Sequence, residues 1–190
     1  MLNGVDRQAL GDVTEAVKVR PELAKFEFRL ENRWEDGARN RSLVDGFAGV
    51  GTEQEHPAPF ALSNDEPLVL LGTDSAPNPV EYLLHALAGC LTTSLVYHAA
   101  ARGIAVRGVK TRFEGDLDLR GFLGLSHEVR KGFREIRAVF EIEGDLTHAQ
   151  KRELMKVGQA FSPVFDMVSR GVPVSCRLAE ESFRAMPSAA

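Results

Sequence analysis

The chain has 190 residues, of which 44% are hydrophobic and 26% charged, with a formal net charge of −4. These values are typical of a soluble globular protein with one substantial core. The net negative charge argues against nucleic acid or an anionic membrane as a partner. The first residues lack the basic and apolar segments of a secretory signal, so we expect the cytoplasm.

The first third of the chain predicts a short lead-in followed by a β-hairpin. Residues 1–22 are polar and mixed, which predicts a loose lead-in or a short helix ahead of a single domain at 23–190. Residues 25–30 alternate between apolar and charged side chains, as a half-buried strand does. A turn at 35–37 and a returning strand over 38–49 complete the hairpin. Residues 51–59 read as a polar connecting segment.

One long helix over 78–103 organises the rest of the chain. Asn78 is a suitable N-cap, Pro79 suits the first helical position, and Glu81 can close a capping box. Arg102 and Gly103 mark its end. Apolar residues surround the helix, so it should be buried on all sides. Its charged residues and histidines interrupt the apolar run that a membrane span needs, so we expect no membrane.

The remaining elements complete an α+β fold. Alternation predicts strands over 104–113 and 135–142, with a charged, glycine-rich connection over 116–131 between them. Thr147 and Gln150 form a second capping box that opens a helix to about residue 161. A short helix ends at Gly171, and 172–178 alternates as a last strand. Since one sheet covers only one side of the central helix, we expect a second copy to cover the other.

Cys90, in the middle of the long helix, is the main chemical candidate. A free cysteine is often only a small core residue, and a reactive thiolate needs a nearby cation or a helix N-terminus. Cys176 lies on the same side of the predicted last strand as its valines, so we interpret it as a structural residue. Neither the two cysteines nor the histidines show metal-ligand spacing, so we expect no metal and no cofactor. A Cys/His hydrolase would need His56 or His127 brought to Cys90 by the fold.

Three segments together resemble the OsmC/Ohr family of osmotically inducible and organic-hydroperoxide-resistance proteins. The first runs Asn78-Pro79-x-Glu81-x-Leu83-Leu84-x-Ala86-Leu87-Ala88-x-Cys90, the second is Gly132-Phe133, and the third is Ser162-Pro163-Val164. The resemblance covers about residues 25–183. It implies an intertwined homodimer, with two antiparallel sheets around central long helices, and a thiol-dependent peroxidase site at the dimer interface.

The resemblance also implies a role for particular residues. Cys90 takes the position of the peroxidatic cysteine, and Arg39 or Arg41 is a candidate for the arginine that holds its thiolate. Ser162 stands where the family has its resolving cysteine, and serine cannot form a disulfide. The orienting carboxylate of the peroxidases falls at Val80; the neighbouring Glu81 is the nearest candidate.

Three hypotheses for function follow. The first is a hydroperoxide reductase that uses Cys90 alone, with its sulfenic acid reduced directly by an external thiol. The second is an inactive dimer of the same fold that binds a small apolar ligand in the interface. The third is an unrelated acyl-transfer or hydrolase activity of Cys90.

Overall fold

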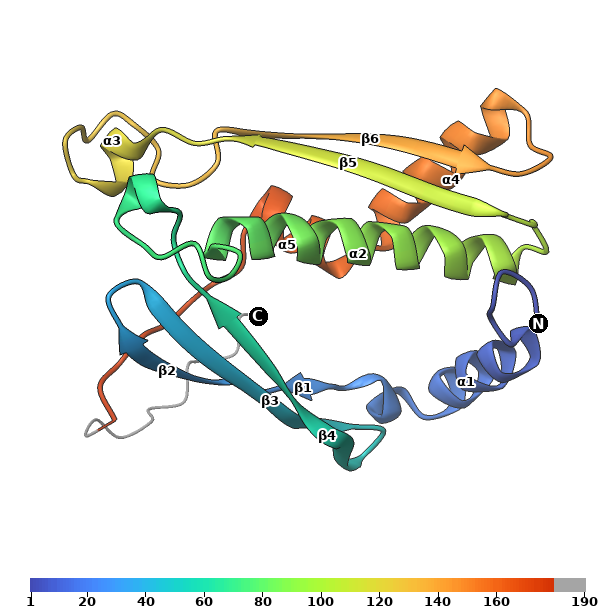
Figure 1. The fold of residues 1–190 in the computed structure, drawn as a ribbon. Helices are drawn as coiled ribbons and strands as arrows, with labels where there is room; N and C mark the ends of the chain where they lie inside the picture. Colours follow the sequence, from blue (N-terminus) through green and yellow to red (C-terminus); the bar gives the residue numbers. More distant parts are fainter. Residues whose placement is uncertain (180–190) are drawn as a thin grey trace.

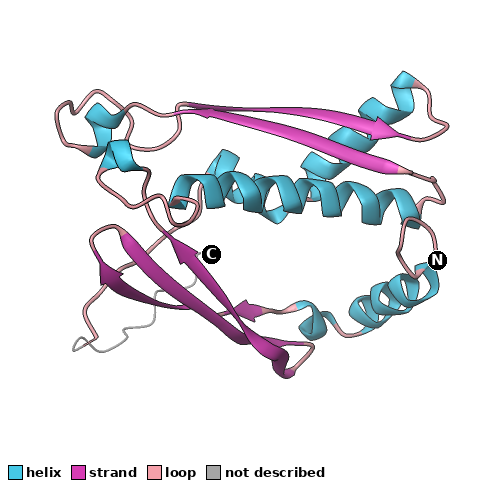
Figure 2. Ribbon diagram, in the orientation of Figure 1, coloured by secondary structure: helices cyan, strands magenta, loops and turns pink. Residues whose placement is uncertain are grey.

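The computed structural model describes residues 1–179, in which two antiparallel sheets lie on opposite sides of a long central helix (Figures 1 and 2). The first sheet, preceded by helix α1, comes from the N-terminal third of the chain. Its elements are α1 (Arg7–Val19), a 3-10 turn (Pro21–Ala24), β1 (Glu27–Phe28), β2 (Glu31–Asp36), β3 (Arg39–Gly49) and β4 (Thr52–Asn64). The prediction of an α+β fold with two antiparallel sheets is confirmed.

The second half contributes the helices and the second sheet. After a 3-10 turn (Leu68–Leu70), the elements are α2 (Pro79–Ala101), β5 (Gly108–Asp116), α3 (Leu119–Phe122), β6 (Glu135–Glu143), α4 (His148–Phe161) and α5 (Pro163–Arg170). The β5–β6 hairpin covers one side of α2, and β1 to β4 lie on the other (Figure 1).

Helix α2 begins and ends where its local sequence predicts. The Asn78 side chain accepts a hydrogen bond from the Glu81 amide, and the Glu81 carboxylate accepts one from the Asn78 amide. Gly103 just beyond the helix has φ of 73°, a left-handed conformation that glycine adopts at little cost. The second capping box, between Thr147 and Gln150, is also formed.

The core lies between the C-terminal half of α2, the β5–β6 hairpin and α4. Its buried cluster consists of Leu95, Ala99, Ile142 and Leu154. Gly158 lets α4 approach α2 closely, because a Cβ there would lie 3.0 Å from the Leu91 carbonyl oxygen. By length and composition α2 could cross a membrane. Its packing against α4, α5 and β5 is instead that of a core helix.

Two strand predictions were wrong, for the same physical reason. Residues 51–59, predicted as a polar connection, form most of β4, which pairs with β3 although it contains Pro57 and Pro59. Residues 172–178, predicted as a strand, have no ladder partner among residues 1–179 and carry no strand assignment. A strand exists only where a neighbouring strand supplies hydrogen bonds, and alternation in the sequence does not reveal that neighbour.

Smaller shifts affect the hairpins. Of the strand predicted over 25–30, only Glu27–Phe28 forms a strand, β1, and β2 begins after it at Glu31. The turn between β2 and β3 lies at Gly37, whose φ is 54°. The strand predicted over 104–113 begins later, at Gly108. The lead-in contains a helix, α1, whose N-cap Asp6 accepts hydrogen bonds from the Gln8 and Ala9 amides.

Candidate active site

Cys90 lies halfway along α2, on a side of the helix that residues 1–179 leave open. The buried side of α2 follows Leu87, Leu91 and Leu95, whose exposed fractions are 4%, 2% and 0%. Residues three, four or seven positions from Cys90 share its side of an α-helix. Of these, Leu83 is 38% and Tyr97 50% exposed, whereas Leu87 belongs to the buried side. Cys90 itself is half-buried, at the boundary between the two sides.

The residues nearest Cys90 on this open side are small. They are Ala86, Gly89 and Thr93, all exposed. Small side chains allow another backbone to approach closely, and they leave the thiol accessible to a reactant of modest size. In the first 179 residues, no hydrogen bond involves the Cys90 thiol.

Ser162 is held next to the turn of α2 that follows Cys90. The Ser94 hydroxyl donates to the Phe161 carbonyl at 3.3 Å, which fixes the end of α4 against α2. Ser162 follows directly, is only 2% exposed, and caps α5 by accepting a hydrogen bond from the Phe165 amide at 3.1 Å. The residue at the expected resolving position is therefore a buried helix cap.

The two candidate arginines lie on the N-terminal sheet. Arg39 forms an ion pair with Asp36 at 3.6 Å, beside the β2–β3 turn. Arg41 is exposed and stands opposite Ser63 of β4 in the register of the sheet. Alternate residues of a strand share one face, so both arginines lie on the face opposite to Phe60, which pairs with Val44. In the part of the chain that the structure describes, no hydrogen bond or ion pair joins either arginine to Cys90, so this role stays a prediction.

The Glu81 side chain forms part of the N-terminal cap of α2. Its carboxylate accepts the Asn78 amide at 2.8 Å in the capping box, nine residues before Cys90. Among residues 1–179 it forms no ion pair with an arginine. Its proposed role in orienting an arginine also stays a prediction.

The junction between the N-terminal sheet and α2 depends on a buried carboxylate. Asp65, directly after β4, is fully buried and accepts five hydrogen bonds: from the amides of Glu66, Thr73 and Ser75 and from the hydroxyls of the last two. The Thr73 hydroxyl contributes most to holding the pKa of Asp65 far below its usual range. The Tyr82 hydroxyl adds a bond to the Ser63 carbonyl at 2.7 Å.

In the sequence, Asp65 has the neighbours of an ordinary loop residue. Its burial and its five donors result from the path of the loop between β4 and α2. The threonine and serine eight and ten positions later were the only local signal, because short hydroxyl side chains commonly pair with an aspartate in loops.

A sequence model of the family described as "OsmC-like protein" matches residues 72–177, more than half of the 190-residue chain. The chain belongs to the OsmC-like protein family. Among curated proteins, no sequence matches.

Solved structures agree with the fold of this family. The OsmC-like protein of Mycoplasma pneumoniae has a TM-score of 0.60 and 16% identity, covering 76% of this chain and 88% of that one. The organic hydroperoxide resistance protein OsmC of Legionella pneumophila has a TM-score of 0.50 and 16% identity, covering 76% and 91%. At such identities the likeness concerns the fold.

Two histidines of this OsmC-like chain, His56 and His98, contact aromatic rings. The His98 ring stacks on Phe161 with centroids 4.1 Å apart, and burial, followed by the charge of Arg102, lowers the pKa of His98. His56 lies between Phe47 and Phe60. Residues 1–179 contain no group of three or more histidine, cysteine or acidic side chains placed to hold a metal ion.

The two cysteines are separate and free. Cys176 is exposed on the segment after α5, and neither cysteine forms a disulfide. The arrangement therefore offers one accessible thiol on the open side of α2, a buried hydroxyl at the expected resolving position, and two arginines on a separate sheet.

Proposed function

We propose that this protein is a homodimeric, thiol-dependent reductase of small hydroperoxides that uses Cys90. The observation that carries the proposal is the position of Cys90, half-buried among small residues on the open side of α2. Membership of the OsmC-like family supports it, as does the fold shared with a protein named for organic hydroperoxide resistance.

The proposed reaction has three steps. The Cys90 thiolate attacks the terminal oxygen of the hydroperoxide, the O–O bond breaks, and after protonation the products are an alcohol and a sulfenic acid. An external thiol then attacks the sulfenic sulfur, releasing water and leaving a mixed disulfide. A second thiol displaces the first as a disulfide and restores Cys90. Because Ser162 cannot act as a resolving thiol, both electrons come from the external reductant.

The thiolate needs a cation, which we propose is Arg39 or Arg41. A nearby guanidinium lowers the pKa of a thiol and increases the thiolate fraction near neutral pH. The two arginines lie near the β2–β3 turn, on the face of the N-terminal sheet opposite to Phe60, so this role requires the β2–β3 end of the sheet of a second copy to reach the open side of α2. We place the reaction in the cytoplasm, where reducing conditions keep free thiols available.

The hydroperoxide assay tests the proposal directly. With dithiothreitol as the reductant, we expect the protein to consume cumene hydroperoxide faster than the same concentration of free cysteine. The physical reason is a thiolate fraction larger than that of a thiol with a pKa near ~8.5. Consumption no faster than by free cysteine would contradict the peroxidase proposal and leave the ligand-binding dimer as the remaining hypothesis.

The exposed surface of the chain supports the homodimer. A monomeric protein of 20.8 kDa is expected to expose about 9,000 Å², whereas this chain exposes 14,483 Å². The excess on one chain is larger than the roughly 1,000–2,500 Å² that each subunit of an obligate dimer commonly buries, so the chain exposes ample surface for such an interface.

Aromatic side chains form much of that surface. A row of rings follows one face of the N-terminal sheet, with Phe28 75% and Phe60 55% exposed. Neighbouring rings in the row have centroids 4.8–6.0 Å apart, and its members are Phe26, Phe28, Phe47, His56 and Phe60. Exposed apolar patches of this kind mark interaction surfaces.

The dimer gives a prediction of its own. Sedimentation equilibrium at micromolar concentration should give twice the chain mass of 20.8 kDa. Phe28→Glu should shift the protein toward monomer or aggregate, because it places a charge in the aromatic row. Arg152→Glu, at an exposed position of helix α4, should not. A wild-type protein that stays a folded monomer would overturn the dimer.

A further inference from the structure

The N-terminal segment, residues 1–24, is fastened to the far end of the molecule by one side chain. The Asn3 carboxamide nitrogen donates to the Ile104 carbonyl at 2.9 Å, and its oxygen accepts the Val106 amide at 2.8 Å. These are the two bonds that a neighbouring strand would make, supplied by one side chain. They join residues about one hundred positions apart, between the end of α2 and β5.

A tight turn presents Asn3 for this contact. Leu2 and Val5 exchange both backbone hydrogen bonds at 2.9 Å, and Asn3 and Gly4 between them have φ of 54° and 78°. Asn-Gly is the preferred pair for a turn with both central φ values positive. The turn Leu2-Asn3-Gly4-Val5 therefore holds the Asn3 side chain in position for its two long-range hydrogen bonds.

The other end of the segment is also fastened. After α1 and a 3-10 turn, the chain enters β1, which pairs with β3. Helix α1 therefore spans from the end of α2 to the N-terminal sheet (Figure 1). The chain runs from Asn3 through the N-terminal sheet and α2 to Ile104. The two Asn3 hydrogen bonds join the ends of this stretch, so that it forms a closed loop.

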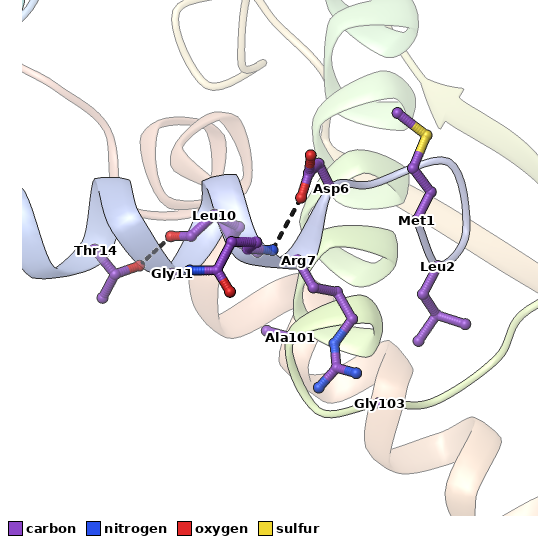
Figure 3. Close-up of a pocket in the computed structure, with 10 residues that line it drawn as sticks. Met1, Leu2, Asp6, Arg7, Leu10, Gly11, Thr14, Ala101 and Gly103 are labelled. Carbon is purple, nitrogen blue, oxygen red and sulfur yellow. Dashed lines mark hydrogen bonds between the residues drawn. The ribbon is translucent and has the colours of Figure 1, made fainter.

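Helix α1 turns a mainly polar side toward its own α2. Arg7, Gly11 and Thr14 line the pocket of about 840 Å³ between α1 and the end of α2, near Ala101 and Gly103 (Figure 3). The apolar stripe of α1 lies about a third of a turn around the helix from these residues, with only Leu10 reaching the pocket. The stripe consists of Ala9, Leu10, Val13, Ala16 and Val17.

Residues 1–179 cover this stripe only in part, with Leu10, Ala16 and Val17 half-buried. No residue of α1 is buried, and Val13 is 60% exposed. The helix lacks the large aromatic anchors and the lysine- and arginine-rich polar face of membrane-surface helices. The chain continues from α1 through the 3-10 turn into β1, where Phe28 belongs to the aromatic row that the proposed dimer covers.

We infer that residues 1–24 are a latch that holds a second copy of this chain, with the α1 stripe packed on that copy and Asn3 closing the latch. This inference rests on the proposed dimer and adds to it. Separation of the two copies then requires the latch to open. The latch governs how fast the copies exchange, and it lies apart from Cys90.

Subunit exchange tests the latch. Unlabelled and isotope-labelled dimers are mixed, and native mass spectrometry follows the growth of mixed dimers. Asn3→Ala removes two hydrogen bonds and should speed exchange roughly tenfold. Val13→Glu, which places a charge in the stripe, should speed exchange at least as much. Val19→Glu is the matched control, because Val19 is 78% exposed and lies outside the stripe; it should exchange like the wild type.

The outcomes separate the latch from the dimer. Equal exchange rates in the wild type, Asn3→Ala and Val13→Glu would overturn the latch while leaving the dimer intact. Equal acceleration by Val13→Glu and Val19→Glu would show that the stripe is not the contact and would also overturn it. A monomeric wild type would overturn the dimer itself. Circular dichroism shows whether each variant keeps its helices, and hydroperoxide consumption per assembled dimer should be unchanged in Asn3→Ala.

Discussion

Replacing Cys90 with serine is expected to reduce hydroperoxide consumption to the rate without protein. The oxygen of serine is not oxidised by peroxide, and the substitution changes little in size at a half-buried position of α2. The loss of rate is measured as consumption of cumene hydroperoxide with dithiothreitol. Cys176→Ser is the matched control and should keep the wild-type rate, since Cys176 is exposed on a segment without a ladder partner within residues 1–179.

The same assay should show inactivation by its own substrate. A sulfenic acid at Cys90 has no internal thiol to trap it, so excess hydroperoxide should oxidise it further to sulfinic acid, which small thiols do not reverse. Activity should therefore fall with peroxide dose, and peptide mass analysis should find two added oxygens on Cys90. Ser162→Cys places a thiol at the family's resolving position and should slow this decay. Loss of activity in Cys176→Ser, or a Cys90–Cys176 disulfide after oxidation, would contradict the one-cysteine cycle.

Asp65→Asn should lower the melting temperature by about 5–10 °C at neutral pH. The carboxylate is fully buried and accepts five hydrogen bonds, and an amide would turn donors toward the Thr73 and Ser75 groups that now donate to it. Asp74→Asn is the matched control, because Asp74 is an exposed aspartate of the same loop. Its left-handed φ of 56° is one that asparagine tolerates well.

The lowered pKa of Asp65 predicts how its contribution to stability changes with pH. The hydrogen bonds place the pKa of Asp65 in the folded protein below its usual value, roughly 4 in an unfolded chain. Its stabilising effect is therefore present at neutral pH and is lost as the pH falls below about 4. The difference in melting temperature between wild type and Asp65→Asn should be constant from pH 5 to 7 and shrink in more acidic solution. A difference that stays unchanged at acidic pH would contradict the role of the charge.

The contrast between helix and strand predictions has a physical cause. The boundaries of α2 and α4 were predicted from caps within a few residues of each end, since the capping hydrogen bonds are local. The β4 strand was missed because its two prolines and exposed side chains hide a pairing that β3 imposes. Residues 172–178 alternate like a strand, but among residues 1–179 no neighbour forms a ladder with them.

The candidate site also combines features that local sequence predicts with features that only tertiary packing decides. The sequence by itself determined the family resemblance, the capped central helix with Cys90 in it, and the serine at position 162, because these depend on residues close together in the chain. Only the tertiary structure decided which side of α2 stays open, that Ser162 is a buried cap beside it, that Asp65 is buried among five donors, and that Asn3 reaches Ile104 and Val106. Burial and long-range hydrogen bonds depend on how distant segments pack, which local patterns do not encode.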